Sequence, residues 1–139
     1  MKPEFIIVHH SLTKDSDTVS WGAIRKYHMA KGWVDIGYHA GIEIVNGNVE
    51  ILLGRRWDKM GAHCTQDGMN RKSLGLCVVG NFDIDPPEQI VLDAATDLIR
   101  YWMLLFQIPV INVLPHRQLA TYKTCPGSKF DFDSFQQLL

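Results

Sequence analysis

The sequence has 139 residues, the size of a single domain, and its formal net charge at pH 7 is −1. Hydrophobic residues make up 46% of it and charged residues 21%, which is typical of a globular protein with one apolar core. The near-neutral charge, without a cluster of lysines or arginines, argues against a nucleic-acid-binding protein. No apolar run is long enough to span a membrane. We therefore expect one domain over residues 1–139 that acts as a monomer.

The three cysteines give a first indication of the compartment. Cys64, Cys77 and Cys125 are odd in number and lack the spacing of a disulfide framework, which favours a reducing environment. Cys77 lies inside an apolar run and is interpreted as a small core residue. The apolar stretch over residues 5–8 is too short for the hydrophobic region of a signal peptide. The protein is therefore expected to be cytoplasmic on synthesis.

The first predicted element is a buried strand over residues 5–10, which are nearly continuous in apolar character. Because side chains alternate along a strand, His9 and His10 are expected to face opposite sides. A helix is then predicted from an N-cap at Ser20 to about Ala30. Three of its side chains, spaced three and four residues apart, would share the packed face: Trp21, Ile24 and His28.

A hairpin of two strands is predicted next, over residues 38–45 and 49–53, because the Asn-Gly pair between them is a strong turn signal. Residues 55–71 show no clear period and are interpreted as a long surface loop. Loops of that length inside a compact domain are usually functional or disordered. Residues 74–80 are apolar again and are interpreted as a second buried strand.

The second half begins with a long amphipathic helix, which is predicted from an N-cap at Asp85 to about Gln107. The apolar residues 110–114 are interpreted as a short strand, and a last helix is predicted to begin near Asp131. Strands and helices are interspersed, and two of the strands have the composition of strands buried on both faces. This pattern predicts the α/β class, with a central mixed β-sheet flanked by α-helices in a single domain.

Three side chains that can bind a metal stand at or after the ends of predicted strands. These are His9, His116 and Cys125. Strand ends in such a sheet cluster at one edge, which would bring the three side chains together. A catalytic zinc typically takes three protein ligands and leaves its fourth position for water. A zinc site is therefore one interpretation of these residues.

The alternative interpretation is a nucleophilic cysteine, with His116 as the base that activates Cys125. Against it, no Asp, Asn or Glu lies between these two residues to orient the base. Lys123, two residues before the cysteine, would lower the pKa of the thiol under either interpretation. The histidines interpreted as structural are His10, His28 and His39.

Four separated segments occur in an order that resembles the zinc-dependent N-acetylmuramoyl-L-alanine amidases of the phage T7 lysozyme type, to which peptidoglycan recognition proteins are related. They cover residues 7–11, 32–39, 70–80 and 116–126. The resemblance extends over essentially the whole chain and is closest through residues 33–39. It implies a central mixed sheet flanked by helices, as the order of elements also predicts.

The resemblance also implies a role for individual residues, position by position. The ligands of one Zn²⁺ ion would be His9, His116 and Cys125. Tyr38 and Lys123 would complete the active site. His63 and Asn70 would bind the substrate. With two neutral imidazoles and one thiolate, the zinc site would keep a net charge of about +1, which supports the ionisation of water.

The implied activity is hydrolysis of the amide bond between N-acetylmuramic acid and L-alanine in peptidoglycan, with peptidoglycan or a muropeptide as the substrate. We expect it to serve host lysis by a phage or prophage, so that protein made in the cytoplasm acts on the cell wall after release. Two alternatives are a non-catalytic peptidoglycan-binding module and a cytoplasmic amidase that recycles muropeptides. Because the non-catalytic relatives typically lose the cysteine ligand, Cys125 favours an enzyme.

Overall fold

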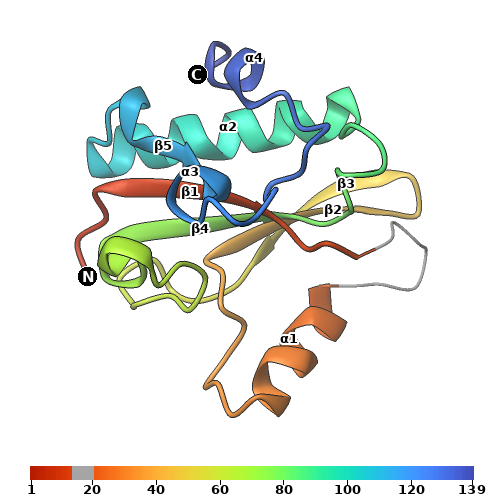
Figure 1. The fold of residues 1–139 in the computed structure, drawn as a ribbon. Coiled ribbons are helices and arrows are strands. Elements are labelled where there is room, and N and C mark those ends of the chain that lie inside the picture. Colours follow the sequence, from red (N-terminus) through yellow and green to blue (C-terminus); the bar gives the residue numbers. More distant parts are fainter. Residues whose placement is uncertain (14–20) are drawn as a thin grey trace.

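The computed structural model describes residues 1–13 and 21–139. Within these residues the chain forms a five-stranded sheet with the strand order β3-β2-β4-β1-β5 (Figure 1). The strands are β1 (Phe5–His10), β2 (Ala40–Val45), β3 (Asn48–Leu53), β4 (Ser73–Val78) and β5 (Val113–Pro115). Neighbouring strands are parallel except in the β2–β3 hairpin, which is antiparallel, so the sheet is mixed as predicted.

Helices cover both faces of this sheet. In Figure 1, α2 lies along one face with α4 beyond it, and α1 lies on the opposite side. The α-helices are α1 (Trp21–Ala30), α2 (Gln89–Phe106), α3 (His116–Leu119) and α4 (Phe132–Gln136), and the 3-10 helices are η1 (Gln66–Arg71) and η2 (Val110–Asn112). The α/β class predicted from the sequence is therefore confirmed. None of the helices in the described residues is long and apolar enough to cross a membrane.

The central strands determine which side chains reach which face of the sheet. β1 pairs with β4 on one side and with β5 on the other, and every residue of β4 is buried. Ile6 and Val8 of β1 belong to the main apolar cluster, which also contains the buried apolar residues of α2. Ile7 belongs to a separate cluster on the opposite face. Because side chains alternate, His9 points to the same face as Ile7, toward α1 and the loop over residues 54–71.

Several local predictions are confirmed. α1 buries the three side chains that the spacing indicated. Cys77 is fully buried, in one apolar cluster with Trp21 and Ile24 of this helix. Asp131 is the N-cap of α4, because its carboxylate accepts a hydrogen bond from the backbone N–H of Ser134 at 3.1 Å. The N-cap expected at Ser20 lies outside the described residues.

The start of two elements differs from the prediction by more than one residue. β2 begins at Ala40, so Tyr38 lies in the irregular segment before the strand. The N-cap position of α2 is occupied by Glu88 rather than by Asp85, and the Glu88 side chain makes no capping hydrogen bond. The two prolines between these acidic residues disfavour helical conformation in the residue that precedes each, which delays the start of the helix.

The apolar run over residues 110–114 is not a single strand. Its first three residues form η2, in which the N–H of Asn112 donates to the carbonyl oxygen of Pro109 at 2.9 Å. Only residues 113–115 pair with β1, so the prediction of a strand over the whole run is wrong. A short apolar run does not reveal its own conformation, and here the turn at its start leaves room for three strand residues.

His39 joins three parts of the fold from a fully buried position. Its backbone N–H donates to the carbonyl of Gly75 in β4, and its Nδ1 accepts from the N–H of the same residue, both at 2.9 Å. Its Nε2 lies 2.9 Å from the carbonyl oxygen of Lys59, and a neutral ring with the proton on Nε2 satisfies both contacts. Burial lowers the pKa of His39 to about 4, although the bond to the Lys59 carbonyl acts in the opposite direction.

We expect this ring to make the stability of the fold depend on pH. The pKa of an unfolded-state histidine is about 6.5, so the stabilising contribution of His39 is fully present above that pH and declines as the pH falls toward about 4. The contribution is on the order of 3 kcal/mol, because each pKa unit corresponds to about 1.4 kcal/mol.

His39→Asn tests this expectation, because it keeps an acceptor near the position of Nδ1 but does not titrate. The free energy of unfolding by urea is measured for both proteins in the presence of a chelator, at about pH 7.5 and about pH 4.5. Wild-type protein should be the more stable at the higher pH and should lose that advantage at the lower one. A difference that does not change with pH would contradict the prediction.

Candidate metal centre and active site

β1 and β5 bring two histidines together at the carboxyl ends of adjacent parallel strands. The residues directly before His9 and His116 are paired across the two strands, so the two side chains lie next to each other. Their ring centroids are 4.4 Å apart. Cys125 is held near this pair because the N–H of Arg117, the residue after His116, donates to the carbonyl oxygen of Cys125 at 2.6 Å. The sheet thus positions two donors, and one short loop positions the third.

The donor atoms of His9, His116 and Cys125 all lie within 4.8 Å of one another, and all three side chains are buried. Nδ1 of His9 is 3.7 Å from Sγ of Cys125. Two such atoms bound to one tetrahedral zinc would be roughly 3.5 Å apart, given the usual zinc–nitrogen and zinc–sulfur distances. The spacing of the three donors therefore fits one metal ion.

The protonation of these groups also suits a metal ion. Burial holds the pKa of His9 well below its usual range and lowers the pKa of His116 to about 4, so both rings are neutral near pH 7 and offer a lone pair. Burial raises the pKa of Cys125 to about 11, although the backbone of His10 and the charge of Lys123 act in the opposite direction. A thiolate here would be a buried charge and needs a cation beside it. The raised pKa also disfavours a free cysteine nucleophile, which needs a lowered one.

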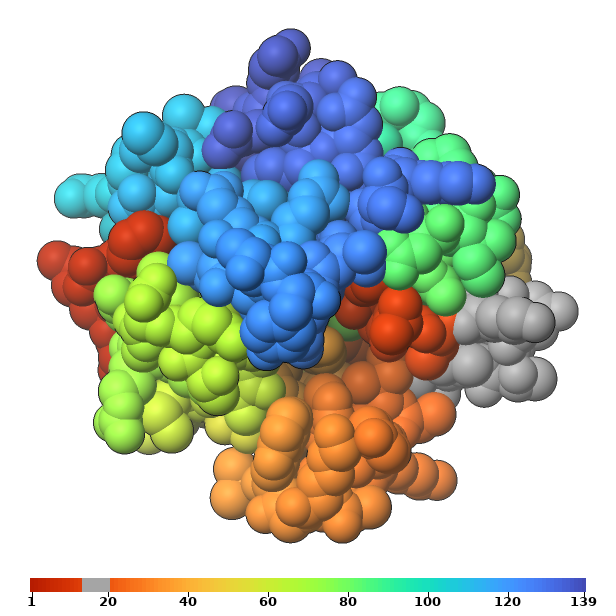
Figure 2. Space-filling view, viewed as in Figure 1, coloured from red at the N-terminus to blue at the C-terminus, as the bar shows by residue number. Residues whose placement is uncertain are grey.

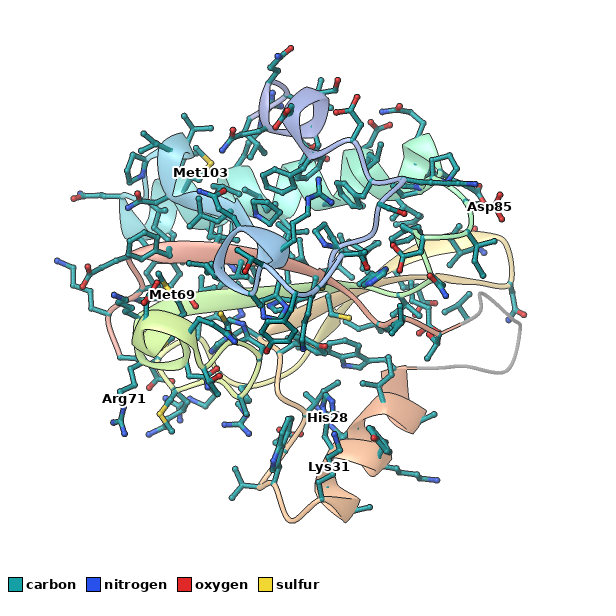
Figure 3. The ribbon with its side chains drawn as sticks, viewed as in Figure 1. His28, Lys31, Met69, Arg71, Asp85 and Met103 are labelled. Atoms are coloured by element: carbon teal, nitrogen blue, oxygen red, sulfur yellow. The ribbon has the colours of Figure 1, made fainter. Side chains whose placement is uncertain are left out.

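The cluster lines a cavity of about 590 Å³. In Figure 2, the blue segment that carries His116 and Cys125 meets the red end of β1, the orange α1 and the yellow-green loop on one face of the molecule. Figure 3 shows His28 and Lys31 on the α1 side of the sheet, and both line the same cavity. His10 also contributes to the wall, although it faces away from His9 along the strand, because the cavity opens where β1 ends.

Both residues that were predicted to complete the active site reach this cavity. The centroid of the Tyr38 ring lies 5.2 Å from that of His9. Burial holds the pKa of the Tyr38 hydroxyl well above its usual range, so it remains a proton donor near neutral pH. Lys123 is exposed at the rim, on the loop that ends at Cys125, and its charge acts on both histidines and on the cysteine. The catalytic roles of Tyr38 and Lys123 stay predictions.

Comparison with known proteins decides which family carries this arrangement. Residues 1–128 match the family described as N-acetylmuramoyl-L-alanine amidase. The chain belongs to this family. The two histidines and one cysteine for which the resemblance implied zinc binding form a buried group that could hold a metal ion.

Curated relatives of this chain include a peptidoglycan-recognition protein and a phage endolysin. Peptidoglycan-recognition protein LB of Drosophila melanogaster is 33% identical over 134 residues, which cover 90% of this chain and 55% of the relative. The endolysin of Klebsiella phage KP32 is 34% identical over 125 residues, which cover 88% of this chain and 79% of the endolysin. The chain therefore spans about half the length of the first of these relatives.

Solved structures share the fold of this chain. The N-acetylmuramoyl-L-alanine amidase LysC from Clostridium intestinale URNW superimposes with a TM-score of 0.83 at 25% identity, over 98% of this chain and 84% of LysC. A mutant of Drosophila PGRP-LB in complex with tracheal cytotoxin gives a TM-score of 0.78 at 28% identity, over 96% of this chain and 80% of that protein. The fold implied by the resemblance is therefore confirmed.

The two residues expected to contact the substrate point in different directions. His63 lines the cavity, and its Nδ1 is 3.0 Å from Nε2 of His9. Among the described residues, Asn70 is not part of the cavity wall. Its side-chain oxygen accepts hydrogen bonds from the backbone N–H groups of His63 and Cys64, at 2.7 and 2.8 Å. The segment that carries them is more ordered than the predicted surface loop, because Cys64 is buried and η1 forms its end. Substrate contact by either residue stays a prediction.

Two residues that support the Cys125 loop were not identified from the sequence. The Arg117 guanidinium donates to backbone carbonyls on both sides of Cys125, at 2.7 Å in the closest case. Asp83 accepts from the hydroxyl of Thr124 at 2.9 Å and from the N–H of Ser128 at 2.7 Å. These contacts are made to backbone or hydroxyl groups, which have no recognisable sequence signal. Together they fix the loop that presents the cysteine.

Proposed function

We propose that the chain hydrolyses the amide bond between N-acetylmuramic acid and L-alanine in peptidoglycan, with one zinc ion bound by His9, His116 and Cys125. The observation that carries this proposal is the buried cluster of two neutral imidazoles and one thiol in the wall of an open cavity. Zinc is the metal proposed because nitrogen and sulfur donors in a set of three, with one position left for water, are typical of catalytic zinc sites.

When bound, zinc supplies a Lewis acid that polarises the amide carbonyl and lowers the pKa of water toward neutrality. The side chains of the protein supply the other interactions. Lys123 reaches the cavity from its rim, and on this proposal its positive charge stabilises the carbonyl oxygen as that oxygen becomes negative. Tyr38 stays protonated and donates a hydrogen bond to the attacking water or to the oxyanion. Because His9 and His116 are fixed by paired strands, the donor geometry exists before the substrate binds.

We further propose that the substrate is bacterial cell-wall peptidoglycan and that its hydrolysis serves host lysis by a phage or prophage. The phage endolysin relative supports the lytic role, since the chain covers 79% of its length. Tracheal cytotoxin is a monomeric peptidoglycan of the diaminopimelic acid type, so the Drosophila relative solved with it supports a peptidoglycan substrate. On this proposal the protein is made in the cytoplasm and reaches the wall after the membrane is breached.

The test measures metal content and turnover in the same preparation. We expect about one zinc per chain, because three protein ligands form one site. Purified cell walls should release stem peptides that begin with L-alanine. Chelation should abolish this release, and added zinc should restore it, because the proposed chemistry depends on the metal.

Each alternative gives a different result in this assay. Binding to cell walls without release of peptide would make the chain a peptidoglycan-binding module. Turnover of soluble muropeptides without turnover of intact walls would support amide hydrolysis but would indicate muropeptide recycling instead of host lysis. Full activity in metal-free protein would favour the nucleophilic cysteine.

A further inference from the structure

His9 directs only one of its two ring nitrogens at the metal-ligand cluster. Its Nδ1 faces Sγ of Cys125 at 3.7 Å, and its other nitrogen, Nε2, lies 3.0 Å from Nδ1 of His63. The His9 and His63 rings meet at 85°, with their centroids 5.0 Å apart. A contact this short between two ring nitrogens requires that one of them donates a proton and the other accepts it.

The groups beyond His63 indicate which nitrogen donates. The Ser73 hydroxyl donates to the carbonyl oxygen of Met69 at 2.7 Å, so the hydroxyl oxygen can accept a further bond. Nε2 of His63 lies 3.5 Å from this oxygen, a long contact that favours the tautomer with the His63 proton on Nε2 and a lone pair on Nδ1. His9 then donates from Nε2 and keeps the lone pair of Nδ1 for the metal. The opposite assignment would place the His9 proton between its ring and Cys125, where it would block metal binding.

The surrounding chain fixes the His63 ring in this place. A Cβ atom at Gly75 would lie 2.6 Å from the ring and one at Gly61 would lie 2.5 Å from it, so the ring occupies space that only glycine leaves open. The side-chain oxygen of Asn70 accepts from the N–H of His63 and anchors its backbone. The ring of His39 contacts the His63 ring edge-on, with centroids 5.6 Å apart. The position of His63 against His9 is therefore built by several parts of the fold.

We propose that His63 is a positioning residue that fixes both the orientation and the protonated nitrogen of the metal ligand His9. The inference rests on the proposed function, because it concerns the zinc ion assigned to this site. It gives His63 a role in metal affinity before any substrate binds, which differs from the substrate contact that the resemblance implied. It also gives Asn70 a role outside the cavity, as the residue that holds the backbone of His63.

Two variants of similar shape separate the hydrogen bond from the space that the ring fills. His63→Asn retains an acceptor, because its side-chain oxygen is one bond from Cγ, as Nδ1 is. His63→Leu has nearly the same shape and offers no acceptor. Zinc affinity of the full chain is measured by competition with a chromophoric chelator, and thermal unfolding of the metal-free proteins shows whether both variants fold equally well.

We expect His63→Leu to bind zinc about 10- to 100-fold more weakly than wild-type protein, which is the usual effect of removing a hydrogen-bond partner from a ligand histidine. His63→Asn should recover much of this loss, although both variants lose the same ring volume and the same contact with Ser73. The difference between the two variants therefore reports the acceptor at His9 and not the packing of the ring.

The outcomes that would overturn the inference can be told apart from a failure of the proposed function. Equal zinc affinity in wild-type protein and His63→Leu would overturn it, as would equal losses in the two variants. Unchanged zinc affinity with a raised KM for peptidoglycan would return His63 to substrate binding. These results leave the proposed function standing, which falls only if the wild-type protein itself fails to bind zinc or to cleave the amide.

Discussion

Cys125→Ser is expected to lose most of the bound zinc and to turn over cell walls at least about 10³-fold more slowly. The metal contributes several kcal/mol to stabilising the transition state, and each ~1.4 kcal/mol is a factor of ten in rate. Serine fills nearly the same volume as cysteine, but its hydroxyl stays protonated at neutral pH and is a poor zinc ligand. The fold should persist, because Cys125 lies outside the main apolar cluster. Zinc content and turnover are measured on the same preparation.

Cys64→Ser is the matched control for this change. Cys64 is also buried, and its thiol donates to the side-chain oxygen of Gln66 at 3.4 Å, a contact that a hydroxyl can replace. The Cys64→Ser variant should retain both its zinc content and its turnover of cell walls. Normal zinc content in Cys125→Ser would remove Cys125 from the ligand set, and lost turnover with normal zinc would revive the interpretation of Cys125 as the nucleophile.

The fold was predictable where burial alone determines the pattern of residues. The near-continuous apolar runs of β1 and β4 mark them as central strands, and both are buried almost throughout. The boundaries of β5 and α2 were not predictable in the same way. The run over residues 110–114 is apolar in either conformation, and only the contacts with β1 determine which part of it pairs. At α2, the proline pair outweighs the acidic N-cap signal of Asp85.

The site was predictable to the extent that its residues are chemically distinctive. A histidine at the end of one strand and a cysteine shortly after another strand can be recognised in the sequence. Their proximity in space depends on β5 lying beside β1. The contact between His9 and His63 joins residues 54 positions apart and involves a second ring nitrogen, so it has no local pattern. The resemblance implied a role for His63, but only the geometry indicates that its ring contacts the metal-ligand candidate His9.

Lys123 differs from the metal ligands in its exposure and in the way it acts. It is exposed at the rim of the cavity, and its positive charge adds to the effect of burial in lowering the pKa of both ligand histidines and opposes the burial that raises the pKa of Cys125. The ammonium is therefore close enough to act on the cluster without being a donor to a metal ion. A group in that position matters most when negative charge develops on the substrate carbonyl, because only interactions that strengthen in the transition state accelerate the step.

Lys123→Ala should keep its zinc and still bind peptidoglycan, yet lower kcat about 10²- to 10³-fold, the usual cost of removing one donor to an oxyanion. Lys123→Arg should recover only part of the rate, because the planar guanidinium places its charge differently. Lys26→Ala is the matched control: it removes the same charge from an exposed position on α1, outside the part of the cavity wall that the structure describes. The measurement is kcat on cell walls beside the zinc content of each protein. Near-normal kcat in Lys123→Ala would show that the lysine is a solvated rim residue, and Tyr38 would then be the protein's remaining donor to the oxyanion.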